Sequence, residues 1–244
     1  MKKILFISNS FGEDATRYLY GISRAAKEEV KVVTLYIGGC SLYRHYRNML
    51  SEEKVYDFIL NGSRSGLLVS LKDALLSDEW DIVALQQCSP KSGDEESYYP
   101  YITELAAYVR KMAPAAKLYV HETWSFADGC SRFNLTNFKN RDEMIPAVKK
   151  VYKKAEKKIN ADGIFPSLDA MNKLYAEIGD KTYRDGFHCS LGVGRYMLGC
   201  LLFAVLFERD VTGNTYRDFD EPISDEELAL AQKIAKEIAL NLRY

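Results

Sequence analysis

The 244-residue sequence has no excess of charge of either sign. It contains 33 Lys and Arg residues and 34 Asp and Glu residues, and these are interspersed along the chain. No block of basic residues is long enough to hold a polyanion. General binding of nucleic acid is therefore not expected.

Long hydrophobic runs are also missing. The longest, residues 196–207, is bounded by Arg195 and Glu208 and is shorter than the roughly 20 residues of a membrane span. We interpret it as a buried helix and expect no membrane partner. The first apolar stretch, residues 4–7, is too short for the core of a secretory signal, which predicts a cytoplasmic location.

Cysteine and histidine are too few and too scattered for a disulfide framework or a metal site. The five cysteines include no C-x-x-C pair, and their number is odd. His45, His121 and His188 have no paired spacing. We therefore expect neither a structural zinc nor a catalytic metal.

Short apolar runs recur along the chain with amphipathic segments between them. Their continuous rather than alternating apolarity is typical of strands that are buried on both faces. The runs are residues 4–7, 32–37, 82–85, 118–120 and, more weakly, 163–165. This rhythm predicts one α/β domain over residues 1–244, with three α/β/α layers and a central, mostly parallel, five-stranded sheet.

Several other segments have distinct patterns. Residues 145–159 and 101–112 are expected to be helical, with Pro146 in a first turn, and Ser224 to Glu227 form a capping box that opens a C-terminal helix. Residues 55–60 are compatible with a short strand before a turn. Residues 125–140 have no periodic pattern, and a loop of this length is a candidate rim or lid of a site.

Polar clusters follow the predicted strands at their carboxyl ends, where ligands bind in open α/β sheets. A further cluster immediately precedes the helix that begins near residue 190. The clusters are Ser8-Asn9-Ser10-Phe11-Gly12, Gly38-Gly39-Cys40-Ser41, Gln86-Gln87-Cys88-Ser89, His121-Glu122-Thr123-Trp124 and Asp185-Gly186-Phe187-His188. We expect them to meet at one edge of the sheet.

These clusters include the groups that an acyl-transfer site needs. A serine hydroxyl is a weak nucleophile until an imidazole removes its proton, and a carboxylate must hold that imidazole in one tautomer. Asp185 and His188 can approach one place if Gly186 turns the chain. On spacing alone, His188 is equally well a capping or core residue, and Ser10 alone is more simply a helix N-cap.

The joint pattern resembles the SGNH, or GDSL-type, hydrolase superfamily. The blocks Ile7 to Phe11, Gly38 to Leu42, Leu85 to Gln87 and Asp185 to His188 look most like a largely uncharacterised bacterial branch of it. The resemblance extends from residue 4 to about residue 205. It implies the flavodoxin-like, three-layer fold of that superfamily.

The resemblance also implies roles for individual residues. Ser10 matches the nucleophile, His188 the base, Asp185 the residue that orients it, and Gly39 an oxyanion donor through its backbone N–H. The sequence departs from the family in two places. Ser8 replaces the usual glycine, and the side-chain Asn donor after the third strand is missing.

A glutamine amide could take the place of the missing donor, since it offers the same N–H groups one methylene further out. We prefer Gln87, which lies farther along the strand, over Gln86. Asn9 and Trp124 are also expected to border the substrate. His45 could line the pocket or lie in an exposed loop, and His121 and Glu122 could contact substrate or be a buried polar pair.

The resulting hypothesis is a serine esterase that requires no cofactor. Polar and aromatic residues near the expected site, with no apolar stretch for a long acyl chain, favour short-chain esters. We expect a small-molecule substrate, most plausibly an acetyl ester of a carbohydrate or similar polar alcohol.

Two alternatives remain open. One is a flavodoxin-like protein that binds phosphate or a nucleotide at residues 8–12. The other is an SGNH-fold protein that binds without turnover.

Overall fold

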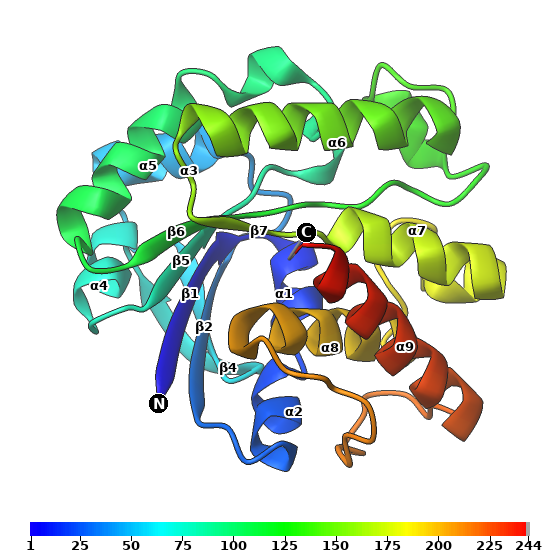
Figure 1. Cartoon of the computed structure of the whole chain (residues 1–244). Coiled ribbons are helices and arrows are strands. Elements are labelled where there is room, and N and C mark those ends of the chain that lie inside the picture. The colour runs from blue at the N-terminus through cyan, green and yellow to red at the C-terminus, as the bar shows by residue number, and fades with distance from the viewer. Residues whose placement is uncertain (243–244) are drawn as a thin grey trace.

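Seven strands form one sheet in the computed structural model, which describes residues 1–242 (Figure 1). Their order is β4-β3-β2-β1-β5-β6-β7. The strands are β1 (Lys2–Ser8), β2 (Val30–Tyr36), β3 (Tyr56–Leu60), β4 (Ser63–Val69), β5 (Ile82–Leu85), β6 (Lys117–His121) and β7 (Gly163–Phe165). The five strands predicted from the apolar runs are all present, and they pair in parallel.

The prediction of five strands is wrong by one hairpin. β3 pairs antiparallel with β2, and β4 pairs antiparallel with β3 at the edge of the sheet. β4 is exposed along nearly its whole length, and its short apolar stretch, Leu67 to Val69, is confined to its end, so the strand was not recognised from its sequence. Gly62 makes the turn between the two strands with φ +81°, and a Cβ there would fall 2.2 Å from the Arg17 carbonyl oxygen.

Helices cover both faces of the sheet, as the three-layer prediction requires (Figure 1). Helices α1, α2, α8 and α9 cover one face, with α7 beside α8, and α3 to α6 cover the other. The helices are α1 (Ser10–Thr16), α2 (Leu19–Ala25), α3 (Leu42–Ser51), α4 (Leu71–Leu76), α5 (Tyr101–Met112), α6 (Arg141–Lys158), α7 (Ser167–Ile178), α8 (Val193–Phe207) and α9 (Asp225–Asn241). Short 3₁₀ turns are η1 (Ser89–Lys91), η2 (Glu95–Tyr98), η3 (Ser131–Leu135) and η4 (Gly179–Thr182).

The helices predicted from the sequence are present, with one change in register. α8 contains the long apolar run and is buried on nearly all sides, and the capping box of Ser224 and Glu227 opens α9. α6 begins at Arg141 because the Asn140 side chain caps it. Pro146 therefore lies in the second turn, not the first. Within residues 1–242, no helix combines the length and apolarity that crossing a bilayer would need.

Candidate active site

A cleft of about 410 Å³ opens where the carboxyl ends of β1, β2 and β5 meet. Its walls come from the segments after these strands and from two later segments. The lining residues are Asn9, Ser10, Phe11, Glu13, Tyr36, Gly38, Gly39, Cys88, Ser89, Pro90, Arg132, Arg184, Phe187 and His188. Four of the five predicted clusters therefore meet at this edge, whereas the cluster after β6 lies outside the cleft.

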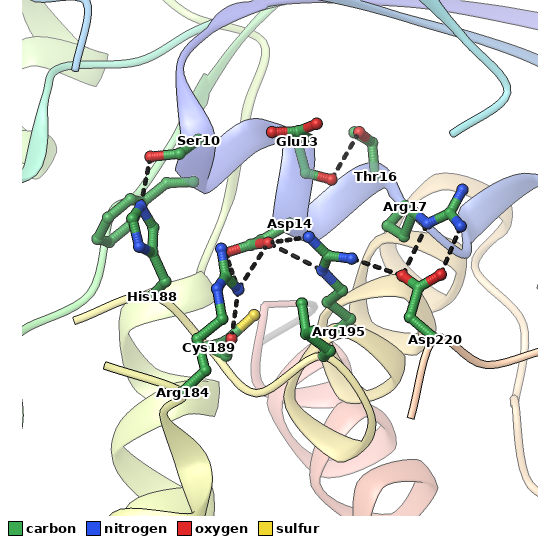
Figure 2. A network of polar contacts seen from close by, with 12 residues as sticks. Ser10, Glu13, Asp14, Thr16, Arg17, Arg184, His188, Cys189, Arg195 and Asp220 are labelled. Atoms are coloured by element: carbon green, nitrogen blue, oxygen red, sulfur yellow. Dashed lines mark hydrogen bonds and ion pairs between the residues drawn. The ribbon is translucent and has the colours of Figure 1, made fainter. Parts of the chain in front are cut away.

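Ser10 is the first residue of α1, and its Oγ lies 2.8 Å from His188 Nε2 (Figure 2). The N-cap of the helix is Asn9, whose side-chain oxygen accepts a backbone N–H of the first turn at 3.1 Å. A Cβ at Gly12 would fall 2.2 Å from Ser8 Oγ, so glycine there lets the helix start directly at the end of β1. Asn9 takes the capping role, and the Ser10 hydroxyl meets the imidazole.

Asp185 holds the other side of the imidazole. His188 Nδ1 lies 2.6 Å from Asp185 Oδ2, and Asp185 Oδ1 accepts the backbone N–H groups of Phe187 at 3.2 Å and His188 at 2.8 Å. Gly186 turns the chain between them with φ +83°. Burial raises the pKa of Asp185, but the hydrogen bonds from His188 and the two N–H groups outweigh it, so the pKa lies below its ordinary value. The carboxylate is therefore anionic at neutral pH.

Aromatic rings pack against the His188 loop. The centroid of the Phe187 ring lies 3.8 Å from that of the His188 imidazole. The Phe11 ring stacks on that of Trp124, with 4.1 Å between the centroids. The Trp124 indole N–H donates to the Phe187 carbonyl oxygen at 2.8 Å. Trp124 is fully buried, so its predicted contact with substrate is wrong. Its ring fills the space beneath Phe11, and its N–H satisfies a buried carbonyl.

A buried carboxylate ties α1 to the Asp185–His188 loop (Figure 2). Asp14, one turn after Ser10, is fully buried. Both of its carboxylate oxygens lie 3.0 Å from Arg184 Nη1, and Arg195 Nε donates to Oδ1 at 2.9 Å. This ion-pair network joins the helix that carries Ser10 to the residue immediately before Asp185. Sequence reasoning missed it, because the partners are some 170 positions apart and no periodic signal links them.

The same network continues to the surface. Arg195 and Arg17 both donate to Asp220 at 2.5 Å. Hydrogen bonds from Arg17 contribute most to holding the pKa of Asp220 well below its usual range. Three guanidinium groups thus surround two carboxylates.

The Gln87 amide is not directed to the cleft. Its Oε1 accepts the N–H groups of Leu42 and Cys88, both at 2.9 Å, and its Nε2 donates to the carbonyl oxygen and hydroxyl of Ser97 at 3.1 and 3.0 Å. An amide this deeply buried must satisfy its polar atoms locally, which leaves no donor for a substrate. The preferred oxyanion role of Gln87 is therefore wrong.

The alternative donor, Gln86, is also committed. Its Nε2 donates to Asn9 Oδ1 at 2.8 Å, and its Oε1 lies 3.1 Å from His121 Nδ1. Asn9 in turn donates to the Cys40 carbonyl oxygen at 3.0 Å. Asn9 borders the cleft as expected, but its amide and that of Gln86 hold the start of α1 rather than a ligand.

Backbone groups are better placed to bind an oxyanion. The backbone N–H groups of Ser10 and Gly39 have no acceptor among residues 1–242, and both residues line the cleft. Gly39 has φ +62°, and a Cβ there would point into open space. The Ser89 hydroxyl also lines the cleft and has no hydrogen-bond partner in the described part of the chain. The sequence pointed to Gly39 as a donor, and it placed Ser89 in a cluster at this edge without assigning it a role.

The other two histidines are structural. His45 is buried, with Nδ1 2.9 Å from the Tyr56 hydroxyl, so it neither lines the pocket nor lies in an exposed loop. His121 is fully buried, and burial lowers its pKa to about 3. Glu122 is buried as well, and burial raises its pKa to about 8. The buried-pair interpretation of His121 and Glu122 is therefore correct.

Arg132 is a cleft residue that sequence reasoning did not single out. It belongs to the segment of residues 125–140, which was expected to form a rim or lid, and it lines the cleft. Its guanidinium carbon lies 3.7 Å from the centroid of the Phe187 ring. Across residues 1–242, no group of three or more His, Cys, Asp or Glu side chains is arranged to hold a metal ion.

Residues 3–238 match the family described as "Domain of unknown function (DUF4886)". The chain belongs to the DUF4886 family. The crystal structure of a DUF4886 family protein from Bacteroides uniformis is 31% identical in sequence, with a TM-score of 0.91, and the match covers 100% of this chain and 96% of that one. A comparison with curated proteins gave no match.

More distant solved structures share the fold of this DUF4886 protein. A candidate SGNH hydrolase from Slackia heliotrinireducens is 21% identical over 83% of this chain and 97% of its own, with a TM-score of 0.58. A carbohydrate esterase family 3 protein from Talaromyces cellulolyticus is 14% identical over 85% and 97%, with a TM-score of 0.56. The fold is that of the SGNH hydrolases, which confirms the resemblance stated from the sequence motifs.

Proposed function

We propose that this protein is a serine esterase in which Ser10, His188 and Asp185 act as one unit. One observation carries the proposal: a continuous hydrogen-bonded chain from Ser10 Oγ through the imidazole to the Asp185 carboxylate, at the wall of a cleft. The nucleophile and the orienting carboxylate are then each within hydrogen-bond distance of the base that lies between them. The phosphate-binding alternative would leave His188 and Asp185 without a role.

In the proposed reaction, Ser10 Oγ attacks the ester carbonyl carbon while its proton passes to His188 Nε2. Asp185 stabilises the imidazolium that forms. The tetrahedral intermediate collapses, the bond to the alcohol oxygen breaks, and His188 returns the proton to that oxygen. Water, deprotonated by His188, then attacks the acyl-serine and releases the carboxylic acid and free Ser10.

The oxyanion of the intermediate would be held by the backbone N–H groups of Ser10 and Gly39. Neither group has another acceptor in the described residues, so both can donate to the developing charge. The Ser89 hydroxyl is the third donor in this proposal. It replaces the side-chain amide that the SGNH resemblance implies and that the glutamines do not supply.

The acyl group in this proposal is short, and we assign it as acetyl. None of the residues that line the cleft is Leu, Ile, Val or Met, so a long alkyl chain would find little aliphatic surface. Each CH₂ left in water forgoes about 0.8 kcal/mol of binding free energy. The alcohol would be a carbohydrate or similar polar molecule, since the walls combine the aromatic residues Tyr36 and Phe187 with polar groups.

A chain-length series tests the acyl part of this proposal. We expect kcat/KM for p-nitrophenyl esters to fall from acetate to butyrate to octanoate, whereas a rise toward octanoate would contradict it. A fluorophosphonate probe tests the nucleophile and should label Ser10 in the wild type but not in Ser10→Ala. A folded wild type that neither labels nor turns over acetate would favour the alternative of binding without catalysis.

A further inference from the structure

We infer that the cleft contains a subsite for an anionic oxygen group on the alcohol half of the substrate, formed by Arg132 on Phe187 and helped by Arg184. This inference rests on the proposed esterase function and narrows its substrate class. It concerns which ester is bound, whereas the proposed triad concerns how an ester is cleaved.

Arg132 is a partly buried cation whose charge is not compensated in the described chain. Its guanidinium carbon lies over the Phe187 ring, 3.7 Å from the centroid, yet the guanidinium has no carboxylate or hydrogen-bond acceptor among residues 1–242. Arg24 and Arg44 also have no such acceptor there, but both are exposed to solvent. A guanidinium stacked on a ring keeps its edge N–H donors available for a planar oxyanion.

Arg132 lies on the side of the cleft where the alcohol would leave. It stacks on Phe187, whose ring is 3.8 Å from that of His188 between centroids. The leaving oxygen takes its proton from His188 Nε2, so the alcohol must occupy the His188 side, with the carbonyl oxygen toward Gly39. Arg132 is thus beside the alcohol half of a bound ester.

No other charged group of the described cleft pairs with this cation. Glu13, the only acidic lining residue in the described chain, pairs with Arg64 at 2.8 Å, and Arg64 also pairs with Asp57 at 2.5 Å. Arg184 uses Nη1 for Asp14 and for the Cys189 carbonyl oxygen, whereas its Nε and Nη2 have no acceptor within residues 1–242. The cleft therefore offers unused guanidinium donors.

The network next to the cleft does not neutralise Arg132 either. Arg17, Arg184 and Arg195 supply three positive charges against the three negative charges of Asp14, Asp220 and the nearby Asp185 carboxylate, so the Arg132 charge stands in addition to a balanced set. Guanidinium groups bind carboxylates in a planar, bidentate manner. We therefore assign to the substrate an alcohol that carries a carboxylate, such as an acidic sugar or a small hydroxy acid.

A pair of matched esters tests the subsite. 3-Acetoxybenzoate carries a carboxylate on its leaving group, and 3-acetoxybenzamide has nearly the same shape without the charge. The measured quantity is the ratio of kcat/KM for the charged ester to that for the neutral one. Arg132→Met should lower this ratio about tenfold relative to wild type, because one charge-assisted contact is lost. Arg132→Lys, which keeps the charge without the planar fork, should give an intermediate ratio.

Arg24→Met is the matched control, since Arg24 also faces a ring, that of Tyr20 at 5.8 Å, but lies outside the cleft. Its ratio should equal that of the wild type. Ser10-dependent hydrolysis of both esters, with the same ratio in wild type and Arg132→Met, would overturn the subsite and leave the esterase proposal standing. Hydrolysis of neither ester by the wild type would overturn the esterase proposal and the subsite with it.

Discussion

Two histidines in this protein make the same pattern of hydrogen bonds, but His188 lines the cleft whereas His121 is fully buried. His188 joins a carboxylate on Nδ1 to a serine hydroxyl on Nε2 at the wall of the cleft. His121 joins the Gln86 amide oxygen on Nδ1, at 3.1 Å, to the Ser167 hydroxyl on Nε2, at 2.9 Å. The two arrangements have equivalent connections, yet only the first faces a space where a substrate could bind.

The comparison shows that a matching pattern of hydrogen bonds does not by itself make a histidine a catalytic base. His121 is fully buried, its pKa is lowered to about 3 by burial, and its orienting partner is a neutral amide. It therefore has no anion to stabilise an imidazolium and no route to a substrate. A base in this fold needs both a carboxylate partner and an open side.

The largest expected effect is on kcat, and it distinguishes Ser10 from Ser167. Ser10→Ala should lower kcat for p-nitrophenyl acetate by on the order of 1,000-fold or more, since it removes the proposed nucleophile. Ser167→Ala, the equivalent change in the buried region, should leave kcat within about threefold. Steady-state kinetics of the two purified variants gives the comparison. Similar losses in both would break the distinction between the regions.

The next largest effect concerns the two carboxyl groups beside the histidines. Glu122 titrates at about 8 in the folded chain and near 4.5 when unfolded, so the folded state retains a proton that the unfolded state has lost. Its stabilising contribution is complete below pH 4.5 and is lost as the pH rises through 8. At about 1.4 kcal/mol per pKa unit, the loss is of the order of 5 kcal/mol.

Glu122→Gln should remove this loss of stability between pH 4.5 and 8, and urea unfolding at pH 5, 7 and 9 would measure it. The Asp185 carboxyl in the cleft has the opposite sign: its pKa is lowered, so its contribution is present above pH 3.8 and is lost in acid. Equal pH slopes for the wild type and Glu122→Gln would contradict the buried assignment of Glu122.

A smaller pair of effects separates the polar groups after β5. Ser89→Ala should lower kcat by about 10- to 100-fold with little change in stability, because it removes a proposed oxyanion donor. Gln87→Ala should instead destabilise the fold by about 1–3 kcal/mol, because it leaves buried N–H groups of Leu42 and Cys88 without an acceptor. Steady-state kinetics and urea unfolding of both variants measure kcat and the free energy of unfolding. A Gln87→Ala variant with wild-type stability and impaired kcat would show that the Gln87 amide acts in the site after all.

The smallest effect is the stability of the two serine variants. Ser167→Ala should cost about 1–2 kcal/mol, since a buried imidazole nitrogen loses its partner. Ser10→Ala should remain within about 0.5 kcal/mol of wild type, because His188 Nε2 can turn to water in the cleft. Unfolding midpoints provide the measurement. A Ser10→Ala that is the less stable of the two would argue that Ser10 is a structural residue.

Much of the sheet and the edge that carries the site could be predicted from the sequence. Five strands were recognisable because parallel strands are buried on both faces and so consist of continuous apolar runs. β4 was not recognised because it is exposed and its short apolar stretch, Leu67 to Val69, is confined to its end. The Asp185–His188 pair was recognisable because its hydrogen bonds are made within a four-residue turn that Gly186 permits.

The sequence by itself determined the order of the strands in the chain, the residues that follow each of them, and hence which polar groups could gather at one edge. Only the tertiary structure decided which of those groups face the cleft. Gln86 and Gln87 are adjacent, yet both amides turn inward, because each finds buried partners from distant segments. Whether a side chain meets core or solvent depends on what packs against it, and for Arg132 and Asp14 those neighbours come from residues far away in the chain.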